Sequence, residues 1–181
     1  MKPSLLILLF CLLATSCKSP EARLPESVKS GSFLKESAER NKKLNEIERA
    51  KIQAIIDADT EKAYIASESG FWYVYNKMNE TDSITPQFGD TVNFDYTISQ
   101  LDGTPIYTEA HLGNRTYVID KEELFTGLRE GLKLMKPSEN ITFIFPSQVA
   151  YGYYGDENKI GTNVPLICEV TLNTITQNTN D

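Results

Sequence analysis

The sequence predicts an α+β fold, in which a curved antiparallel sheet of five to six strands wraps around one short helix and is preceded by an N-terminal helical segment. Two observations carry this prediction. After residue 67, apolar residues alternate with polar ones over several short stretches, which indicates strands with one buried face. Between residues 120 and 135 the apolar residues instead recur at helical spacing.

The composition is that of a globular chain, and it excludes several classes of protein. Of the 181 residues, 40% are hydrophobic, which is enough for a packed domain. The formal net charge of −7 argues against binding to nucleic acid, because there is no basic stripe to neutralise phosphates. His111 is the one histidine, and no His, Cys and carboxylate residues have metal-ligand spacing. We therefore expect neither a metal nor a cofactor.

The N-terminus has the layout of an export signal. An apolar run from Leu5 to Leu13 follows Lys2 and is too short to span a bilayer. Small residues then lead to Cys17 in the sequence LLATSC, which resembles the lipobox of bacterial lipoproteins. We expect residues 1–16 to be removed and Cys17 to carry acyl chains that anchor the protein in the bacterial envelope, facing the periplasm. The alternative is a conventional signal peptide with an accidental cysteine.

A tether and a helical segment separate Cys17 from the predicted domain. Residues 18–32 are polar and contain Pro20, Pro25 and Gly31, a composition typical of a flexible linker. Residues 33–63 lack Gly and Pro, and their apolar residues form only a narrow stripe at helical spacing. We interpret residues 17–66 as the acylated cysteine, a tether and a solvated helical spacer. Dimerisation through the helix stays open.

Residues 67–181 carry the strand patterns of the predicted domain. Residues 71–77 are aromatic and β-branched, as strands often are. In residues 92–98 the apolar side chains occupy every second position, and a turn signal, LDG, follows. Further strands are predicted at residues 115–119, 141–145 and 165–175.

The predicted helix, DKEELFTGLREGLKLM, has two competing N-terminal signals. Asp120 and Glu123 resemble a capping box, and Thr126 is an equally suitable N-cap. A start at Thr126 would leave Leu124 and Phe125 just ahead of the helix, where they could line a pocket.

Two glycines lie on the apolar stripe of this helix. Gly127 and Gly131 each cost about 1 kcal/mol relative to alanine inside a helix. Their presence indicates a helix backbone pressed closely against another part of the chain.

Four segments, in this order, resemble the FKBP-type peptidyl-prolyl cis-trans isomerase domain: GDTVNFDYTISQLDGTPI, ELFTGLREGLKLM, PSQVAYG and VPLICEVTL. The resemblance covers about Ser69–Thr176 and implies an isomerase that acts on proline-containing segments of exported proteins. The lipoprotein signal and the N-terminal helical segment further resemble the gliding-motility-associated isomerase lipoproteins of gliding bacteria, which implies a role in motility.

The resemblance also implies the residues of a substrate pocket. The family's tyrosine on the long strand corresponds to Tyr96, and its two apolar residues before the helix correspond to Leu124 and Phe125. The tyrosine of the AYG turn, whose hydroxyl binds the ligand in the family, corresponds to Tyr151. Leu128 stands at the pocket floor, where the family usually has tryptophan.

Several pocket positions depart from the family pattern. The phenylalanine–aspartate pair after the turn is Ile106-Tyr107, so the pocket aspartate is missing. Arg115 replaces a common aromatic wall residue, and Cys168, which we expect to be a small core residue, replaces a phenylalanine. The missing aspartate favours an alternative function, a non-catalytic peptide-binding or scaffold lipoprotein of an envelope machine.

An apolar pocket of this kind is chemically sufficient for prolyl isomerisation. Rotation about the peptide bond is opposed by resonance, with a barrier of about 18–20 kcal/mol. The twisted transition state loses conjugation and polarity, so a dry pocket favours it over the planar ground state. Such a reaction requires no nucleophile, metal or cofactor.

The sequence LLATSC predicts a mature protein that begins at Cys17 and carries acyl chains. We expect intact-mass spectrometry to find this modified N-terminus, and the protein to partition into the detergent phase because buried acyl chains add about 0.8 kcal/mol per CH₂ group. An unmodified cysteine, or a mature chain that starts at another residue, would contradict the prediction.

Overall fold

The computed structural model describes residues 27–179, and their side chains from residue 33 on. The predicted signal peptide and Cys17 lie outside the described residues. The chain divides after Glu39, and the second compact unit is Arg40–Asp181. This unit contains the sheet, the short helices and the second half of the long helix α2 (Ser27–Ala58). In the part of the chain that the structure describes, no helix is both long and apolar enough to span a bilayer.

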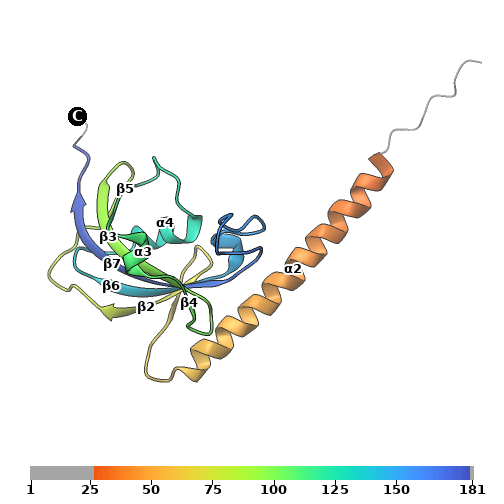
Figure 1. Ribbon diagram of the computed structural model, residues 1–181, viewed down its shortest axis with the longest axis horizontal. Helices are drawn as coiled ribbons and strands as arrows, with labels where there is room; N and C mark the ends of the chain where they lie inside the picture. Colours follow the sequence, from red (N-terminus) through yellow and green to blue (C-terminus); the bar gives the residue numbers. More distant parts are fainter. Residues whose placement is uncertain (1–26, 180–181) are drawn as a thin grey trace, which may run out of the picture. The chain divides into compact units, whose positions relative to one another are not determined.

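A curved antiparallel sheet of seven strands forms the body of the described unit (Figure 1). The spatial order is β1-β2-β6-β7-β3-β4, and β5 also pairs with β3. The strands are β1 (Ile65–Ala66), β2 (Trp72–Lys77), β3 (Thr91–Ser99), β4 (Pro105–Tyr107), β5 (Arg115–Val118), β6 (Asn140–Phe145) and β7 (Leu166–Thr176). The predicted α+β class and antiparallel sheet are confirmed, and a two-residue strand, β1, extends one edge.

The two longest strands, β3 and β7, pair over nearly their whole length and contribute eight of the 21 buried hydrophobic residues among those that the structure describes. Their register runs from Thr91 opposite Thr176 to Ser99 opposite Ile167. Alternate side chains point to the buried face, as the period of two predicts. The buried side chains of these strands are Val92, Phe94, Tyr96, Ile98, Leu166, Cys168, Val170 and Leu172.

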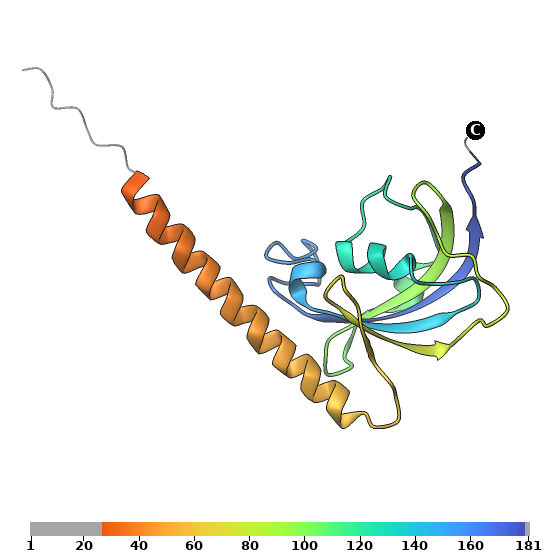
Figure 2. The same cartoon turned by 180° about the vertical axis from the view of Figure 1, so that it is seen from behind.

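Helix α4 (Thr126–Leu132) lies in the hollow of the sheet, as both views in Figures 1 and 2 show. A Cβ atom on Gly127 would come within 2.5 Å of the Phe145 ring and 2.8 Å of the Val149 carbonyl oxygen. A Cβ atom on Gly131 would lie 2.9 Å from the Phe143 ring. The two glycines are therefore required by a close approach between the helix backbone and the sheet, as predicted.

The helix begins at Thr126, so neither Asp120 nor Thr126 is its N-cap, and the start lies close to the later of the two predicted signals. Phe125 is the N-cap residue and has extended backbone angles, so Leu124 and Phe125 precede the first turn. Asp120 does not cap the helix, because its backbone adopts a φ of 59° in a turn after β5. Its carboxylate instead pairs with Arg129 Nε at 3.3 Å and Lys133 Nζ at 2.9 Å. The helix is consequently shorter than the predicted residues 120–135.

The second half of α2 packs on the domain, which corrects the interpretation of this segment as a solvated spacer. Ile52 is fully buried and Glu48 is 3% exposed. Glu48 Oε2 accepts a hydrogen bond from the Ser147 amide at 2.8 Å, and Oε1 accepts one from Ser147 Oγ at 2.7 Å. Arg49 lies over the Trp72 ring at 5.4 Å. The domain boundary after residue 66 stays a prediction.

Two short helical elements complete the described unit. The helix α3 (Glu109–Leu112) contains His111, whose ring Nδ1 lies 2.8 Å from Thr108 Oγ1. The 3₁₀ helix η1 (Ser147–Val149) follows β6 and opens the long loop that leads to β7. Because Ser147 is hydrogen-bonded to Glu48, it connects the start of this loop to α2.

The burial of Ile52 predicts that α2 contributes to the stability of the domain. Ile52→Ala should lower the free energy of unfolding by about 2–4 kcal/mol, because it leaves a cavity between helix and domain. The matched control is Ile47→Ala on the same helix, where the side chain is 46% exposed. We expect this control to change stability by less than about 0.5 kcal/mol. Equal effects of the two substitutions in urea denaturation would contradict the packing of α2.

Candidate functional site

A pocket of about 580 Å³ opens beside the N-terminus of α4, and we call it the α4 pocket. Three parts of the chain form it: the start of β5, the segment between β5 and α4, and the loop after η1. The lining residues are Arg115, Glu122, Glu123, Leu124, Phe125, Arg129, Ala150 and Tyr151.

Two aromatic rings form the apolar wall of the α4 pocket. The centroids of Phe125 and Tyr151 lie 5.0 Å apart. Phe125 also meets Phe145 of β6 edge to face, with centroids 5.3 Å apart. The N-cap position places Phe125 ahead of the helix, and Gly152, with a φ of 60°, lets the chain turn directly after Tyr151. Both rings are therefore held by the backbone as well as by packing.

Two of the predicted pocket residues, Tyr96 and Leu128, are buried and do not line the α4 pocket, and Cys168 is a core residue as expected. Leu128 and Cys168 are fully buried, and Tyr96 is 4% exposed. The hydroxyl of Tyr96 nevertheless reaches the pocket wall, where it accepts a hydrogen bond from Arg115 Nη1 at 3.4 Å. Arg115 Nη2 donates to the Glu123 carbonyl oxygen, also at 3.4 Å. Arg115 thus connects the core tyrosine to the segment ahead of α4.

The Tyr151 hydroxyl is the polar group best placed to meet a ligand in the α4 pocket. Burial raises the pKa of Tyr151 well above its ordinary value, and the neighbouring Tyr96, Cys168 and Asp156 act in the same direction, whereas Arg115 lowers it. The phenol is therefore neutral at physiological pH. Within the described residues its hydroxyl has no hydrogen-bond partner, so its proton is available to a ligand carbonyl.

The family has an aspartate at the position of Tyr107. Here the Tyr107 side chain instead forms a hydrogen bond with an aspartate from another part of the chain. The Tyr107 hydroxyl donates a hydrogen bond to Asp156 Oδ2, on the loop between η1 and β7. The other oxygen of Asp156 accepts the backbone N–H groups of Asn158 at 3.0 Å and Ile160 at 2.7 Å. Lys159 Nζ lies 4.9 Å from the centre of the Tyr107 ring. Neither Ile106 nor Tyr107 lines the α4 pocket.

Asp156, the hydrogen-bond partner of Tyr107, is a residue that the sequence analysis missed. Burial alone would raise the pKa of this carboxyl group. The hydrogen bonds from Tyr107 and from the backbone of Ile160 and Asn158 lower the pKa by more than burial raises it, so the pKa lies below its ordinary value. The composition of the segment GDENKIG indicates an Asp-centred turn. The partner of that turn, 49 residues earlier in the chain, is not apparent from the sequence.

The geometry of the α4 pocket suits the binding of a partly apolar ligand. The rings of Phe125 and Tyr151 form an apolar part of the lining, and the Tyr151 phenol is neutral. Glu122, Glu123, Arg115 and Arg129 supply the charged part. In the region that the structure covers, no three His, Cys, Asp or Glu residues are close enough together to hold a metal ion.

Comparison with known proteins finds matches to one family of prolyl isomerases. The family model described as "FKBP-type peptidyl-prolyl cis-trans isomerase" matches residues 82–173. A probable FKBP-type isomerase FkpA of Neisseria meningitidis is 30% identical over 104 residues, which are 58% of this chain and 37% of the relative. The isomerase FkpA of Aeromonas hydrophila is 29% identical over 143 residues, 72% of this chain and 52% of the relative. The chain thus spans about half or less of these curated relatives.

Solved structures share the fold. FkpA of Escherichia coli aligns with a TM-score of 0.60 and 21% identity, over 97% of this chain and 83% of that one. A peptidyl-prolyl cis-trans isomerase of Pseudomonas syringae aligns with a TM-score of 0.60 and 18% identity, over 75% of this chain and 96% of its own. At these identities the likeness establishes the architecture.

The bond between Tyr107 and Asp156 predicts a pH-dependent contribution to stability. Tyr107→Phe should lower the free energy of unfolding by about 0.5–1 kcal/mol at pH 7, a modest effect because solvent screens the pair. A carboxyl group with a lowered folded-state pKa stabilises the fold above its unfolded pKa, about 4, and this contribution is lost as the pH falls through the folded-state pKa. The difference between wild type and variant should therefore shrink below about pH 4.

Urea denaturation at several pH values measures this difference. The matched control is Tyr154→Phe, since Tyr154 lies on the same loop and is 85% exposed. A difference that stays constant between neutral and acidic pH would mean that Tyr107 stabilises the loop by packing alone.

Proposed function

Because the chain belongs to the FKBP-type peptidyl-prolyl cis-trans isomerase family, we propose that it catalyses the cis–trans isomerisation of prolyl peptide bonds. The observation that carries this proposal is the α4 pocket itself. Leu124, Phe125 and Tyr151 supply apolar surface and one neutral hydroxyl group to a space of about 580 Å³. Four charged residues also line this space: Arg115, Glu122, Glu123 and Arg129. This combination suits a proline ring and the carbonyl group beside it.

In the proposed mechanism the chain binds the twisted form of the substrate better than its planar forms. The proline ring packs against Phe125 and Leu124, and water leaves the prolyl amide. A twisted amide loses the resonance responsible for the barrier of about 18–20 kcal/mol, and its carbonyl group becomes less polar. An apolar wall therefore stabilises the transition state relative to the ground state. Tyr151 Oη donates a hydrogen bond to a substrate carbonyl and holds the peptide in place.

Arg115 has a positioning role in this proposal. Its guanidinium group is held by the Tyr96 hydroxyl and the Glu123 carbonyl oxygen at the pocket edge. A fixed cation at this point attracts the carbonyl oxygens of an incoming peptide. The replacement of an aromatic wall residue by arginine thus changes how the peptide is oriented, while Phe125 retains the apolar contact.

A second candidate function is non-catalytic peptide binding, as a scaffold lipoprotein of an envelope machine. The specific observation in its favour is at Tyr107. The family's pocket acid is absent there, and the Tyr107 hydroxyl is engaged by Asp156. Under this function the α4 pocket would hold a proline-containing segment without accelerating its isomerisation.

The proposal extends to the location of the protein. We propose that acylated Cys17 anchors it to the bacterial envelope, facing the periplasm, where it acts on folding or assembling exported proteins and serves gliding motility. The sequence LLATSC supports the anchor, and the layout of signal and helical segment supports the link to motility. Dimerisation through α2 belongs to the same proposal, and the exposed side chains of Phe33, Leu34 and Ile47 support it.

A protease-coupled assay with a prolyl tetrapeptide tests the proposed activity. Tyr151→Phe keeps the ring and removes the hydroxyl group that binds the substrate. We expect kcat/KM to fall by up to about tenfold, which corresponds to about 0.5–1.5 kcal/mol for one hydrogen bond. Tyr153→Phe is the matched control, because this tyrosine stands two residues later and is 71% exposed.

The same assay separates the two candidate functions. A folded wild-type protein that binds the peptide but does not accelerate its isomerisation would establish the scaffold function and end the enzymatic one. Equal losses in Tyr151→Phe and Tyr153→Phe would instead refute the assigned role of the Tyr151 hydroxyl.

A further inference from the structure

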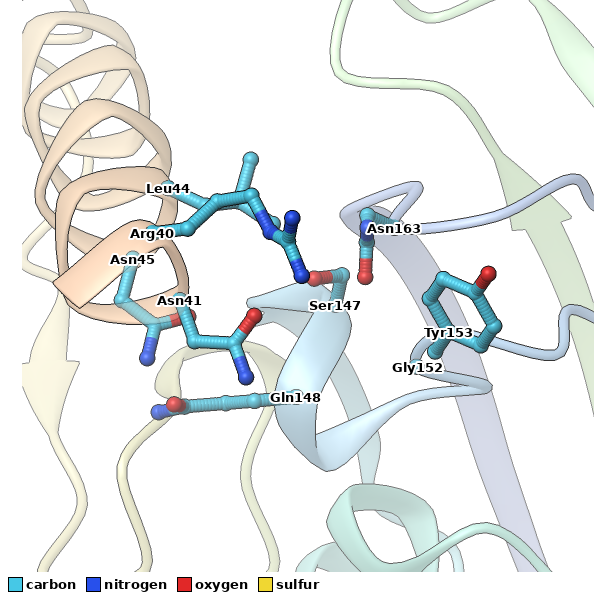
Figure 3. Close-up of a pocket in the computed structure, with 9 residues that line it drawn as sticks. All are labelled: Arg40, Asn41, Leu44, Asn45, Ser147, Gln148, Gly152, Tyr153 and Asn163. Carbon is cyan, nitrogen blue, oxygen red and sulfur yellow. The ribbon is translucent and has the colours of Figure 1, made fainter. Parts of the chain in front are cut away.

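A second pocket lies on the other side of the loop between η1 and β7, and we call it the α2 pocket. Its volume is about 440 Å³, and its walls are α2 and the loop (Figure 3). Asn41 and Asn45 project from the helix toward Gln148, and Asn163 lies across the space from Arg40. This pocket is thus lined mainly by side-chain amides.

These amides have unused hydrogen-bonding capacity. Within the described part of the chain, the side chains of Asn41, Asn45, Gln148 and Asn163 have no hydrogen-bond partner, so their donors and acceptors face solvent. The asparagine side chains of the strands β2, β3, β6 and β7, and those of Asn79 and Asn114, are in contrast all paired. The strand residues are Asn76, Asn93, Asn140 and Asn173. Unpaired amides gathered around one cavity indicate a surface that is prepared for a polar ligand.

The walls of the α2 pocket are fixed in place. Glu48, one turn along α2 from Asn45, is 3% exposed and bound by both the amide and the hydroxyl of Ser147. This double hydrogen bond ties α2 to the start of the loop. A ligand therefore meets walls that are already positioned, which reduces the entropic cost of binding.

The lining residues of the α2 pocket indicate which kind of ligand it can bind. Arg40 is the charged residue among its lining residues, and no carboxylate lines it. The chain as a whole carries a formal net charge of −7. Because side-chain amides dominate the lining, a ligand of this pocket carries both hydrogen-bond donors and acceptors.

One loop lines both pockets. Ala150 and Tyr151 face the α4 pocket, whereas Gln148, Gly152 and Tyr153 face the α2 pocket. A ligand chain that crosses this loop can occupy both pockets at once. An extended polypeptide gains about 3.3–3.6 Å per residue, so a few residues suffice to cross a loop.

We propose that the α2 pocket is a second binding site for an extended polypeptide, which holds the client segment that flanks the proline in the α4 pocket. Side-chain amides pair with the N–H and C=O groups of a peptide backbone whatever its sequence. The site would thus raise affinity for long unfolded chains without selecting among them. The substrate class rests on the proposed isomerase function, while the existence of the site rests on the pocket alone.

The test compares the full-length protein with two double variants. Asn41→Ala/Gln148→Ala removes two amides from the α2 pocket. Gln53→Ala/Gln177→Ala removes two exposed amides elsewhere, one of them on the same helix. The probes are a prolyl tetrapeptide and a fluorescent, uncharged peptide of about 20 residues with one central proline, long enough to reach both pockets.

We expect the first double variant to raise the Kd of the long peptide by about fivefold or more, as the loss of two hydrogen bonds implies. Its activity on the tetrapeptide, and the Kd of the control variant, should stay within about twofold of wild type. In ¹⁵N spectra, the long peptide should shift the side-chain amide signals of Gln148 and Asn41, and the tetrapeptide should not.

Equal Kd values for the two double variants would overturn the proposal. So would displacement of the long peptide by a soluble amino-sugar oligomer, which would assign the pocket to a saccharide. If the wild type does not isomerise the tetrapeptide, the proposed function fails, whereas an amide-dependent Kd for the long peptide would still establish the second site.

Discussion

The close contact between helix α4 and the sheet is the constraint on which the rest of the domain depends. Gly127 lies against Phe145 and the backbone of Val149 so closely that no side chain fits between them. This contact sets the height of the helix above the sheet, and the N-cap position then directs Phe125 toward Tyr151. A helix that lay further from the sheet would move Phe125 away from Phe145 and Tyr151. Packing of the backbone thus comes first, and the apolar wall of the site follows from it.

The loop between η1 and β7 is held at two points by charged acceptors. Glu48 binds Ser147 at its beginning, and Tyr107 binds Asp156 near its middle. Between these points the backbone turns through Gly152 and places successive side chains on opposite sides. Surface loops are usually mobile, because few contacts restrain them. Here the buried contact between Glu48 and Ser147 and the contact between Tyr107 and Asp156 restrain the loop. They give it the order that a binding surface requires.

The sequence predicted the parts of this structure that depend on local pattern. Alternation in β3 and β7 identified the central strands, and the two glycines correctly indicated a close helix contact. Long-range partners were not predictable in this way. Glu48 belongs to a helix rich in charged residues, and nothing local distinguishes it from its exposed neighbours, although it is buried against Ser147. The Asp156 carboxylate was missed for the same reason, because its partner Tyr107 is brought to it only by the folded sheet.

The burial of Cys168 means that chemical modification of its thiol reports the opening of the domain. The side chain is fully buried between β3 and β6, and burial raises the pKa of the thiol far above its ordinary value. Only a thiolate that reaches solvent reacts with an alkylating or oxidising reagent at a useful rate. The central strand must therefore separate from its neighbours before Cys168 is modified. The rate at which a reagent labels Cys168 under native conditions measures how often the sheet opens, and no engineered cysteine is needed.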